Sequence, residues 1–537
     1  MRTFGAILCA LVLTSVLSWC DEQHHHELKE REVGSVHFST SCKAGIASDS
    51  NRAVALLHSF QYEDARQAFE AITRQDPSCA MAYWGIAMSH YHGLWDNSDL
   101  AAGREAQRKA VEAAASNPAT TRRERAYIET LGEIYREDGK DPYVHAQAFE
   151  RAMGALQVAY PEDTEAAIFH ALTLDITAPK TDTAYSNQQK CGEILEPIFE
   201  KLPDHPGVAH YLIHCYDNPV LAQQGLKAAR AYAKIAPASA HAHHMPSHIF
   251  TRVGLWDESV QSNKRSEALA AAAEPKSREE ARDQRLHAMD YMEYAFLQSG
   301  RVSDAKNVAS SMNALAPVSG LSMIGEYASA AIPARYAVEL GKWDEARTLV
   351  PSMSAVPWAQ AITWMAVGVG AARSGNLKRA AEAQRKLEEL RDATAKLNNH
   401  YWAKQVDVQL QEVEGWLAQQ SGEGTKALTL MTAAAGLEES MDKHAVTPGQ
   451  IIPAREMLGQ LLLEQKRPEE ALIAFAAALK VAPKRFNALY GAARAAEAAG
   501  NGSMAQRYYQ ELLEVVTSDE RPEIEMARKK VQMAAKK

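Results

Sequence analysis

The chain has 537 residues, a length that suits two to four ordinary domains or one long repeat array. Its residues are 46% apolar and 23% charged, which is typical of a folded protein and not of a disordered one. The net charge of −9 leaves no electrostatic footprint for nucleic acid, and no Lys- and Arg-rich run indicates a membrane surface.

The first 20 residues predict an export signal, and residues 21–45 predict an N-terminal arm. Arg2 precedes the apolar stretch FGAILCALVLTSVL, whose 14 residues are too few to span a membrane. Two ends of the signal stay open: ordinary cleavage near Ser18, or a lipid anchor at Cys20, where Trp19 replaces the small residue that lipid attachment prefers. No later run is long and apolar enough to predict a transmembrane segment in the mature chain.

Export implies an oxidising compartment, in which cysteines form disulfides. Beyond the signal the chain has Cys42, Cys79, Cys191 and Cys215, and four cysteines allow three pairings. We favour a Cys42–Cys79 disulfide because each residue precedes a predicted helix, and adjacent hairpins bring such helix starts together. Cys191 and Cys215 are expected to be buried small side chains.

Most of the chain beyond residue 46 indicates helical hairpins. Alternation with a period of two, the signal of a strand, is nearly absent. Ser259, Ala305 and Ala346 hold equivalent places in predicted second helices, yet they are 46 and 41 residues apart. The array is therefore divergent, with longer loops or helices in its middle.

Histidines concentrate in this middle region, where seven of the 19 lie within residues 205–248. In the stretch HPGVAHYLIHCYDNP, Pro206 suits the first turn of a helix, so His210 and His214 fall at i and i+4 on one face. Two metal ligands on one helix need this spacing. Asp217 follows His214 by three residues, as a reserve ligand or as a hydrogen-bond partner of a ligand.

The stretch HAHHMPSHIFTRVGLW adds four histidines around Pro246. A proline inside a helix costs about 3 kcal/mol, and the residue before it avoids helical geometry, so the regular helix is predicted to start at Pro246. Residues 241–244 then form an irregular lead-in. Because successive hairpins of a solenoid pack on one another, the histidines of both stretches are expected to converge on its concave face. The predicted metal ligands are His210, His214, His244 and His248, with His241 in reserve.

Such a cluster suits one transition metal ion, either Zn, Cu, Ni or Fe. The alternative is that the rings pack between helices and hydrogen-bond to backbone carbonyls. Catalysis is the weaker alternative, because the HExxH, GxSxG and phosphate-loop motifs are absent. A metal-dependent hydrolase would need a base, and Asp217 is the only residue that the sequence offers.

Further aromatic, histidine and charged residues are candidates to line a ligand groove. Some lie past the end of a helix, and others lie in the proline-punctuated stretch MDKHAVTPGQIIPAR, because long loops of solenoids often lie at the binding face. The groove candidates are His92, Trp95, Trp256, His287, Asp290, His444 and Arg455.

The clearest repeat lies near the C-terminus. The stretch REMLGQLLLEQKRPEEALIAFAAALKVAP has Leu458-Gly459, Ala471 and Phe475 at the places of the 34-residue tetratricopeptide (TPR) pattern. The small residue and the aromatic residue recur 34 positions later, at Ala505 and Tyr509. The fold predicted is all-α, an α-solenoid of roughly eight to ten TPR-like hairpins forming a superhelix. Residues 46–272 form an N-terminal half with the histidines, and residues 273–537 form a C-terminal half with a capping helix.

Several stretches together resemble the exported TPR proteins found in bacteria. They include CAMAYWGIAMS, HPGVAHYLIHCYD, HAHHMPSHIFTRVGLW and RFNALYGAARAAEAAG, and the resemblance spans residues 36 to about 515. It implies an α-solenoid in the periplasm or cell envelope of a bacterium, and it assigns no catalytic residue. One departure is Gly93, where the family's proline is expected. The function expected is a scaffold that binds a peptide, a protein or a small ligand in its concave groove.

Overall fold

The structure is a computed structural model that describes residues 30–94, 98–275, 278–351, 354 and 356–534. Every regular element in these residues is a helix, which confirms the predicted all-α class. Within the same residues the helices pair into twelve successive hairpins, more than the eight to ten that repeat spacing predicted. The predicted signal peptide and Trp95 lie outside the described residues.

The first six hairpins carry the histidine-rich region. They are α2 (Ala47–His58) with α3 (Tyr62–Gln75), α4 (Ala80–His90) with α5 (Leu100–Ser116), α6 (Arg122–Ile134) with α7 (Pro142–Ala159), α8 (Thr164–Ile176) with α9 (Ser186–Lys201), α10 (Pro206–Tyr216) with α11 (Leu226–Ile235), and the broken helix α12 (Ala240–His244) and α13 (Pro246–Val253) with α14 (Trp256–Ala273).

The other six hairpins continue the array to a final single helix, α27 (Pro522–Ala534). They are α15 (Arg278–Gln298) with α16 (Val302–Asn313), α17 (Met323–Glu339) with α18 (Trp343–Ala346), α19 (Pro357–Arg373) with α20 (Leu377–Lys396), α21 (His400–Gln420) with α22 (Gly424–Glu439), α23 (Ala454–Glu464) with α24 (Pro468–Val481), and α25 (Phe486–Ala498) with α26 (Gly502–Val515).

A phenylalanine packed against a glycine fixes the helix crossings in the most regular repeats. A Cβ atom added to Gly491 would overlap the ring of Phe475, and one added to Gly85 would overlap the ring of Phe69. The phenylalanine precedes the glycine by 16 residues in both places. The missing side chain lets the ring approach the next helix closely, so this pair sets the packing of consecutive hairpins.

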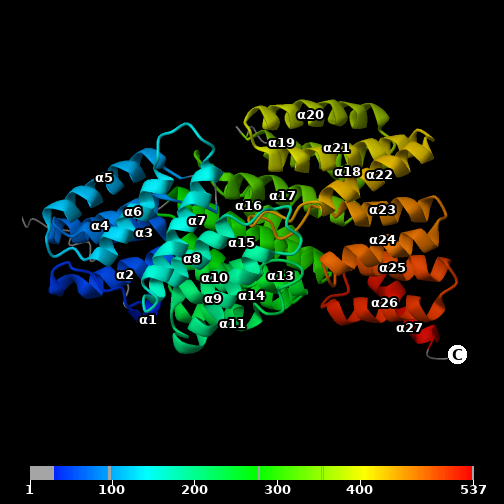
Figure 1. The fold of residues 1–537 in the computed structure, drawn as a ribbon. Helices are drawn as coiled ribbons and strands as arrows, with labels where there is room; N and C mark the ends of the chain where they lie inside the picture. The colour runs from blue at the N-terminus through cyan, green and yellow to red at the C-terminus, as the bar shows by residue number, and fades with distance from the viewer. Residues whose placement is uncertain (1–29, 95–97, 276–277, 352–353, 355, 535–537) are drawn as a thin grey trace, which may run out of the picture.

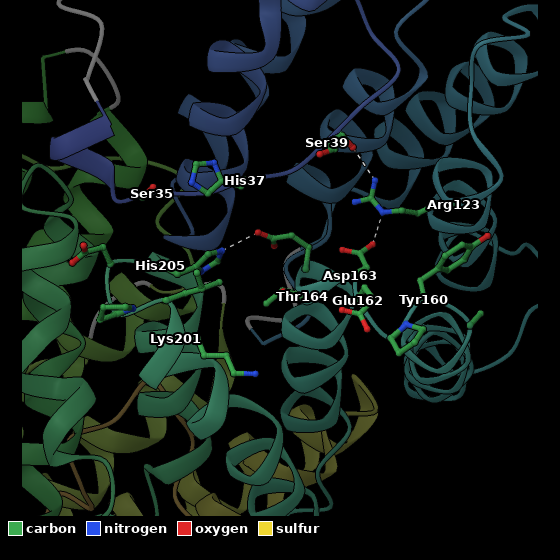
Figure 2. Close-up of a pocket in the computed structure, with 16 residues that line it drawn as sticks. Ser35, His37, Ser39, Arg123, Tyr160, Glu162, Asp163, Thr164, Lys201 and His205 are labelled. Atoms are coloured by element: carbon green, nitrogen blue, oxygen red, sulfur yellow. Dashed lines mark hydrogen bonds and ion pairs between the residues drawn. The ribbon is translucent and has the colours of Figure 1, made fainter.

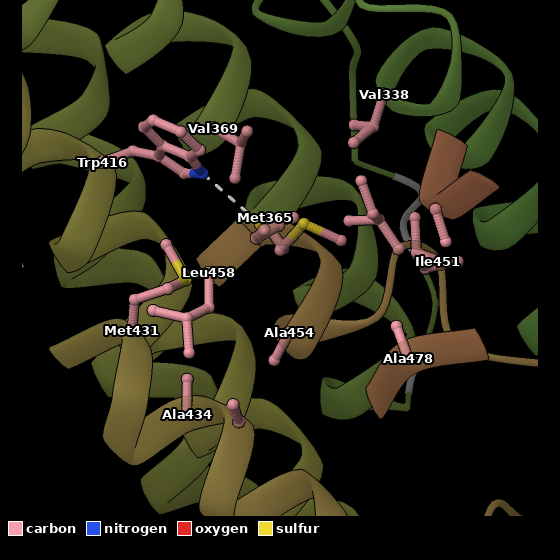
Figure 3. Close-up of a cluster of buried hydrophobic side chains, with 14 of the residues drawn as sticks. Val338, Met365, Val369, Trp416, Met431, Ala434, Ile451, Ala454, Leu458 and Ala478 are labelled. Atoms are coloured by element: carbon pink, nitrogen blue, oxygen red, sulfur yellow. Dashed lines mark hydrogen bonds between the residues drawn. The ribbon is translucent and has the colours of Figure 1, made fainter. Parts of the chain in front are cut away.

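The largest apolar core lies in the C-terminal half, between α17 and α27. Figure 3 shows part of it, where Trp416 faces the methionine and leucine side chains of the neighbouring helices. The indole N–H of Trp416 donates to Sδ of Met457 at 3.4 Å, which satisfies its only polar group inside an otherwise apolar cluster. Interdigitated side chains of this kind join each hairpin to the next.

The array turns back on itself, so that its end lies beside its middle (Figure 1). Arg485 directly precedes α25 at the end of the α24–α25 corner, and it is fully buried. Its guanidinium lies 2.8 Å from a carboxylate oxygen of Glu339 and 2.9 Å from one of Glu456, and it donates to the hydroxyl of Tyr294 at 2.9 Å. One side chain therefore ties α25 to α17, α23 and α15.

The segment between α22 and α23, residues 440–453, fills the interior of the superhelix. Lys443 of this linker lies 2.8 Å from Asp217, which follows α10, and Asp442 lies 3.1 Å from Arg252 of α13. The hydroxyl of Tyr291 in α15 donates to the carbonyl of Thr447 at 2.9 Å. The predicted loop at the concave face thus occupies that face and contacts the histidine-bearing helices directly.

The N-terminal arm is part of the fold from Val33 onward, because Val33, Val36 and Phe38 are buried in the first core. Cys42 at its end forms a disulfide with Cys79. Cys191 and Cys215 form a second disulfide between α9 and α10, so the expectation of two unpaired buried cysteines is wrong. The pairing follows from helix packing, which places their Cα atoms 6.2 Å apart.

Candidate functional site

Helix α10 carries the first two histidines as the sequence predicted. Pro206 occupies the first turn, and the ring of His205 caps the helix by accepting the N–H of Val208 at 3.3 Å. His210 and His214 project from one face toward the interior, and both are buried. The cap and the proline fix where the helix begins, and hence which face these two rings share.

Helices α12 and α13 carry the second set. Helix α13 begins at Pro246 as predicted, but residues 241–244 belong to the short helix α12 and are not an irregular lead-in. Met245 has φ −53° and ψ −38°, so the residue before the proline is helical after all. Because proline has no backbone N–H, one helical hydrogen bond is missing at Pro246, but the backbone on both sides of it stays helical.

The first histidine triad consists of His210, His214 and His241. Nε2 of His210 lies 3.1 Å from Nε2 of His214 and 3.0 Å from Nε2 of His241. Nδ1 of His210 lies 2.6 Å from the carbonyl oxygen of His58, so Nδ1 donates and Nε2 keeps its lone pair. Imidazoles that bind one ion at about 2.0–2.1 Å have nitrogens about 2.9–3.4 Å apart, so these separations suit ligation.

The second histidine triad consists of His244, His248 and His287. Nε2 of His244 lies 3.0 Å from Nε2 of His248, and the His287 ring lies 4.1 Å from the His244 ring. Nδ1 of His244 donates to Oδ1 of Asn263 at 2.7 Å. The amide nitrogen of Asn263 donates to the carbonyl of Ser259 at 2.8 Å, which fixes the orientation of this amide.

Lone pairs face each other in the second triad. Nδ1 of His248 donates to Oδ2 of Asp217 at 2.8 Å, so His244 and His248 both carry their proton on Nδ1 when neutral. Their Nε2 atoms then approach at 3.0 Å with no proton to share. Burial lowers the pKa of both rings, which disfavours an added proton. A metal cation placed between the two Nε2 atoms would accept both lone pairs.

His287 adds a second unsatisfied group to this triad. Its side chain is 4% exposed, and neither ring nitrogen has a hydrogen-bond partner among the described residues. A buried polar group without a partner costs about 1–3 kcal/mol. The sequence placed His287 beside Asp290 as a groove candidate, but Asp290 pairs with Arg335 at 2.5 Å and His287 joins the histidines.

Asp217 accepts a hydrogen bond from His248 of the second triad, and it is not a member of either triad. Its Oδ1 lies 2.8 Å from Nε of Arg252, and its Oδ2 lies 2.8 Å from Nζ of Lys443. Burial opposes ionisation of Asp217, but Lys443 and Arg252 outweigh it and hold the pKa of this carboxyl well below its usual range. A carboxylate so engaged is a poor general base, and it orients His248 instead.

The two triads are neighbours, and they do not share one point. The rings of His214 and His248 are 6.2 Å apart between centroids, as are those of His241 and His244. The sequence expected His210, His214, His244 and His248 around a single ion. The structure divides these four between the triads. It completes the first with His241, the predicted reserve ligand, and the second with His287, which the sequence had placed in a groove.

A third group, His58, Glu165 and His205, was not predicted. Nε2 of each histidine lies 2.8 Å from a different oxygen of Glu165. Burial opposes ionisation of Glu165, but His205 and His58 hold the pKa of its carboxyl well below its usual range. No local signal could find this group, because its residues come from three separate helical hairpins. His58 is a lone histidine at the end of α2.

A pocket of about 830 Å³ reaches this third group and neither triad (Figure 2). His205, Glu165 and Lys201 line this pocket. Arg123 on the opposite side is held by Asp163 at 2.5 Å and by the carbonyl of Ser39 at 2.8 Å. This arginine fastens the N-terminal arm to α6 and is therefore already paired at the pocket wall.

The groove candidates do not line one groove. Trp256 is buried and donates to the carbonyl of Lys484 at 3.3 Å, and Arg455 pairs with Glu439 at the surface. His444 packs against Trp402 inside the linker, with 5.4 Å between ring centroids. His92 stacks on Tyr62 at 4.1 Å and lines a pocket of about 460 Å³ with His287. The linker fills the space that the sequence assigned to a groove.

The fold and the site define an α-solenoid of TPR-like hairpins with a histidine-rich interior. The tetratricopeptide repeat family matches residues 51–118 and 456–522. Among solved structures, the chain is similar to the human IFIT1 dimer with PPP-AAAA, at 13% identity and a TM-score of 0.37 over 87% of this chain and 90% of that one. It is also similar to yeast Tom70, at 10% identity and a TM-score of 0.30 over 91% and 96%.

Similarity at this level carries no information about a ligand. No curated protein matches the chain. A search of the described helices for one with the length and apolarity of a membrane crossing found none.

Proposed function

We propose that the protein is an exported TPR-type scaffold that holds transition metal ions in its interior, one at each histidine triad. The observation that carries the proposal is the approach of two Nε2 lone pairs, those of His244 and His248, at 3.0 Å. The unpartnered ring of His287 beside them supports it. Two triads of this kind favour two ions, where the sequence alone suggested one.

The groups around the triads also support metal binding. Metal-bound histidines usually donate their other N–H to a carboxylate or a carbonyl. His248 donates in this way to Asp217, His244 to Asn263 and His210 to a backbone carbonyl. Imidazole donors without thiolates suit Zn, Cu, Ni or Fe, and the Irving–Williams order favours Cu.

Export and a scaffold role complete the proposal. Two disulfides support an oxidising compartment, such as the periplasm or cell envelope of a bacterium. The TPR match supports a protein or peptide partner, since solenoids offer long binding surfaces. The linker occupies the interior, which favours the outer faces of the hairpins for that partner. A hydrolase remains the weaker alternative, because Asp217 is engaged by two cations.

Elemental analysis of untagged protein tests the metal site. We expect about two equivalents of one transition metal after loading and dialysis, one for each triad. Replacing His214 and His248 together by Ala should abolish uptake, and replacing His170 by Ala is the matched control, because this half-buried histidine belongs to neither triad. The run His24–His26 should be replaced by Ala throughout, so that it contributes no binding. Less than about a tenth of an equivalent would refute the proposal.

A further inference from the structure

Two pockets flank the triads, and they differ in charge. The acidic pocket, about 460 Å³, reaches one histidine of each triad, His241 and His287. The linker pocket, about 260 Å³, reaches His214 from the other side. An ion that binds to buried histidines must pass through the protein surface, and each of these two pockets reaches a triad from that surface.

The acidic pocket presents carboxylates that have no cationic partner within the part of the chain that the structure describes. Glu279, Glu280 and Asp283 lie on its wall, and none of them forms an ion pair within the described residues. Arg66 is the only Lys or Arg that lines this pocket among those residues, and it is already paired with Glu63 and Glu70. The pocket therefore has a negative potential, which attracts cations.

The pKa of Glu280 is shifted in the direction that a negative potential produces. Burial, followed by the carboxylates of Asp64, Glu63 and Asp283, raises the pKa of Glu280 to about 7. Burial also raises the pKa of Asp283 to about 6, against hydrogen bonds from the N–H groups of Ser322 and Gly325. A cation that enters the pocket relieves the repulsion among these groups.

The linker pocket lacks this excess of negative charge. Lys180 and Lys443 lie on its wall. Its three carboxylates are balanced by cations: Asp175 interacts with Lys180, Asp217 is paired with Lys443 and Arg252, and Asp442 is paired with Arg252. A metal cation that approached His214 by this route would meet the positive charge of both lysines.

We infer that the acidic pocket is the entrance of the metal centre, where carboxylates capture transition-metal cations and deliver them to His241 and His287. This inference rests on the proposed metal site. The buried, unpartnered ring of His287 lines the pocket and gives a captured ion its first imidazole ligand. The ring of His244 lies next, with 4.1 Å between its centroid and that of the His287 ring, and it is the second histidine of the same triad that the ion would reach.

Loading kinetics test the entrance. Metal-free protein is mixed with excess Co²⁺, and the growth of the cobalt absorption band is followed by stopped flow. We expect E279Q/E280Q to load about tenfold more slowly than the unchanged protein, because electrostatic steering contributes about 10- to 1,000-fold to association rates. The final amount of bound cobalt should be unchanged, since neither glutamate belongs to a triad.

Salt and a matched variant sharpen the test. Raising the ionic strength from about 0.01 M to about 1 M should slow the unchanged protein more than E279Q/E280Q, because salt screens the steering charges. D175N is the control, since Asp175 lines the linker pocket. It should load at the unchanged rate.

Three outcomes would overturn the inference. E279Q/E280Q could load at the unchanged rate with the same salt dependence, or D175N could be the slow variant, which would move the entrance to the linker pocket. A protein that binds no cobalt at equilibrium would remove the proposed metal site itself. Equilibrium stoichiometry thus separates failure of the site from failure of the entrance.

Discussion

Asp217 shows how one buried carboxylate can organise a site that it does not join. It accepts from His248, Arg252 and Lys443 at 2.8 Å each. Removing its charge would leave His248 with a weaker acceptor and two buried cations with less compensation. The loss of this charge should therefore lower the affinity of the proposed site for metal, and we assign it no role in a reaction.

We therefore predict that D217N lowers the affinity of the second triad for its ion by about 10- to 100-fold, the usual effect of losing a ligand's carboxylate partner. The control is D442N, which disturbs Arg252 without touching a histidine. Competition with a chelator measures both variants. Equal affinities for D217N and the unchanged protein would contradict the role assigned to Asp217.

The stability of the metal-free protein should fall in mild acid. Burial lowers the pKa of His210, His214, His241, His244 and His287 well below the usual value. The unfolded chain binds protons near pH 6.5 while the folded chain does not, so unfolding is favoured as pH decreases below that value. Each such histidine contributes up to about 1.4 kcal/mol per pH unit.

Thermal unfolding between about pH 7.5 and pH 5.5 checks this prediction, because it spans the ordinary histidine pKa. We expect a steep decrease of Tm in this range for the metal-free protein and a smaller decrease near neutral pH once metal is bound. A flat profile for the metal-free protein would indicate that the rings titrate normally.

At the residue scale, the sequence identified most of the histidines that form the triads, but it did not predict how they divide between the two triads. The i, i+4 spacing identified His210 with His214, and His244 with His248 also lies at i, i+4. The third member of each triad comes from another element, so helix periodicity alone could not assign it. Glu165 and Asn263 had no signal at all, because their roles arise only from contacts between hairpins.

At the scale of the elements, the Cys191–Cys215 disulfide fastens α9 to α10, the helix that carries two of the three histidines of the first triad. Cys215 is the neighbour of His214, so the bond constrains α10 at the site itself. A disulfide that closes a loop of this size contributes about 3 kcal/mol to stability. Its loss should loosen α10 before it affects distant hairpins, because repeat proteins couple mainly to their neighbours.

We predict that C191A/C215A lowers the free energy of unfolding by about 3 kcal/mol. It should also increase hydrogen exchange of α10 amides relative to those of α25. The matched comparison is C42A/C79A, which removes the other disulfide and should leave exchange in α10 unchanged. Unchanged exchange in α10 for C191A/C215A would show that packing alone orders the helix.

Element boundaries were predictable where local chemistry sets them. Pro206 and Pro246 mark helix starts as expected, because proline suits the first turn. The short helix before Pro246 was not expected, since the rule for the residue before proline is a preference that packing overrode at Met245. Repeat spacing could not identify all of the unevenly spaced hairpins in the middle of the chain, so the predicted number of hairpins was too low.

At the scale of the whole molecule, buried ion pairs hold the turned-back array. Arg485 compensates Glu339 and Glu456 in a region with no exposure for any of the three side chains. Removing one partner of a buried pair costs about 3–5 kcal/mol, because it leaves an uncompensated charge. We predict that R485M weakens the contact of α25 with α15 and α17.

Small-angle scattering and limited proteolysis measure this effect. R485M should increase the radius of gyration and expose cleavage sites near the α24–α25 corner. The control is R528M, because Arg528 in the last helix forms an exposed ion pair with Asp519, which precedes that helix. A compact, protease-resistant R485M protein would show that apolar packing closes the array without the arginine.

The return of the chain to its own middle could not be predicted from the sequence. Repeat periodicity describes how each hairpin contacts the next, and it contains no information about contacts between distant hairpins. Arg485 and Glu339 are 146 residues apart, and neither belongs to the TPR pattern. The solenoid class was thus predictable, whereas its closure depends on a few buried charges.

The linker has a consequence for the order in which the chain matures. Lys443 and its partner Asp217 are 226 residues apart, so α10 and α13 are synthesised long before the segment that covers them. N-terminal parts of a chain generally fold first. The histidines therefore gather while their environment is still wet, and the last third of the chain seals them. If the proposed ions are bound, a truncation before residue 440 would leave them in contact with solvent, so retention of metal would report that synthesis has passed the linker.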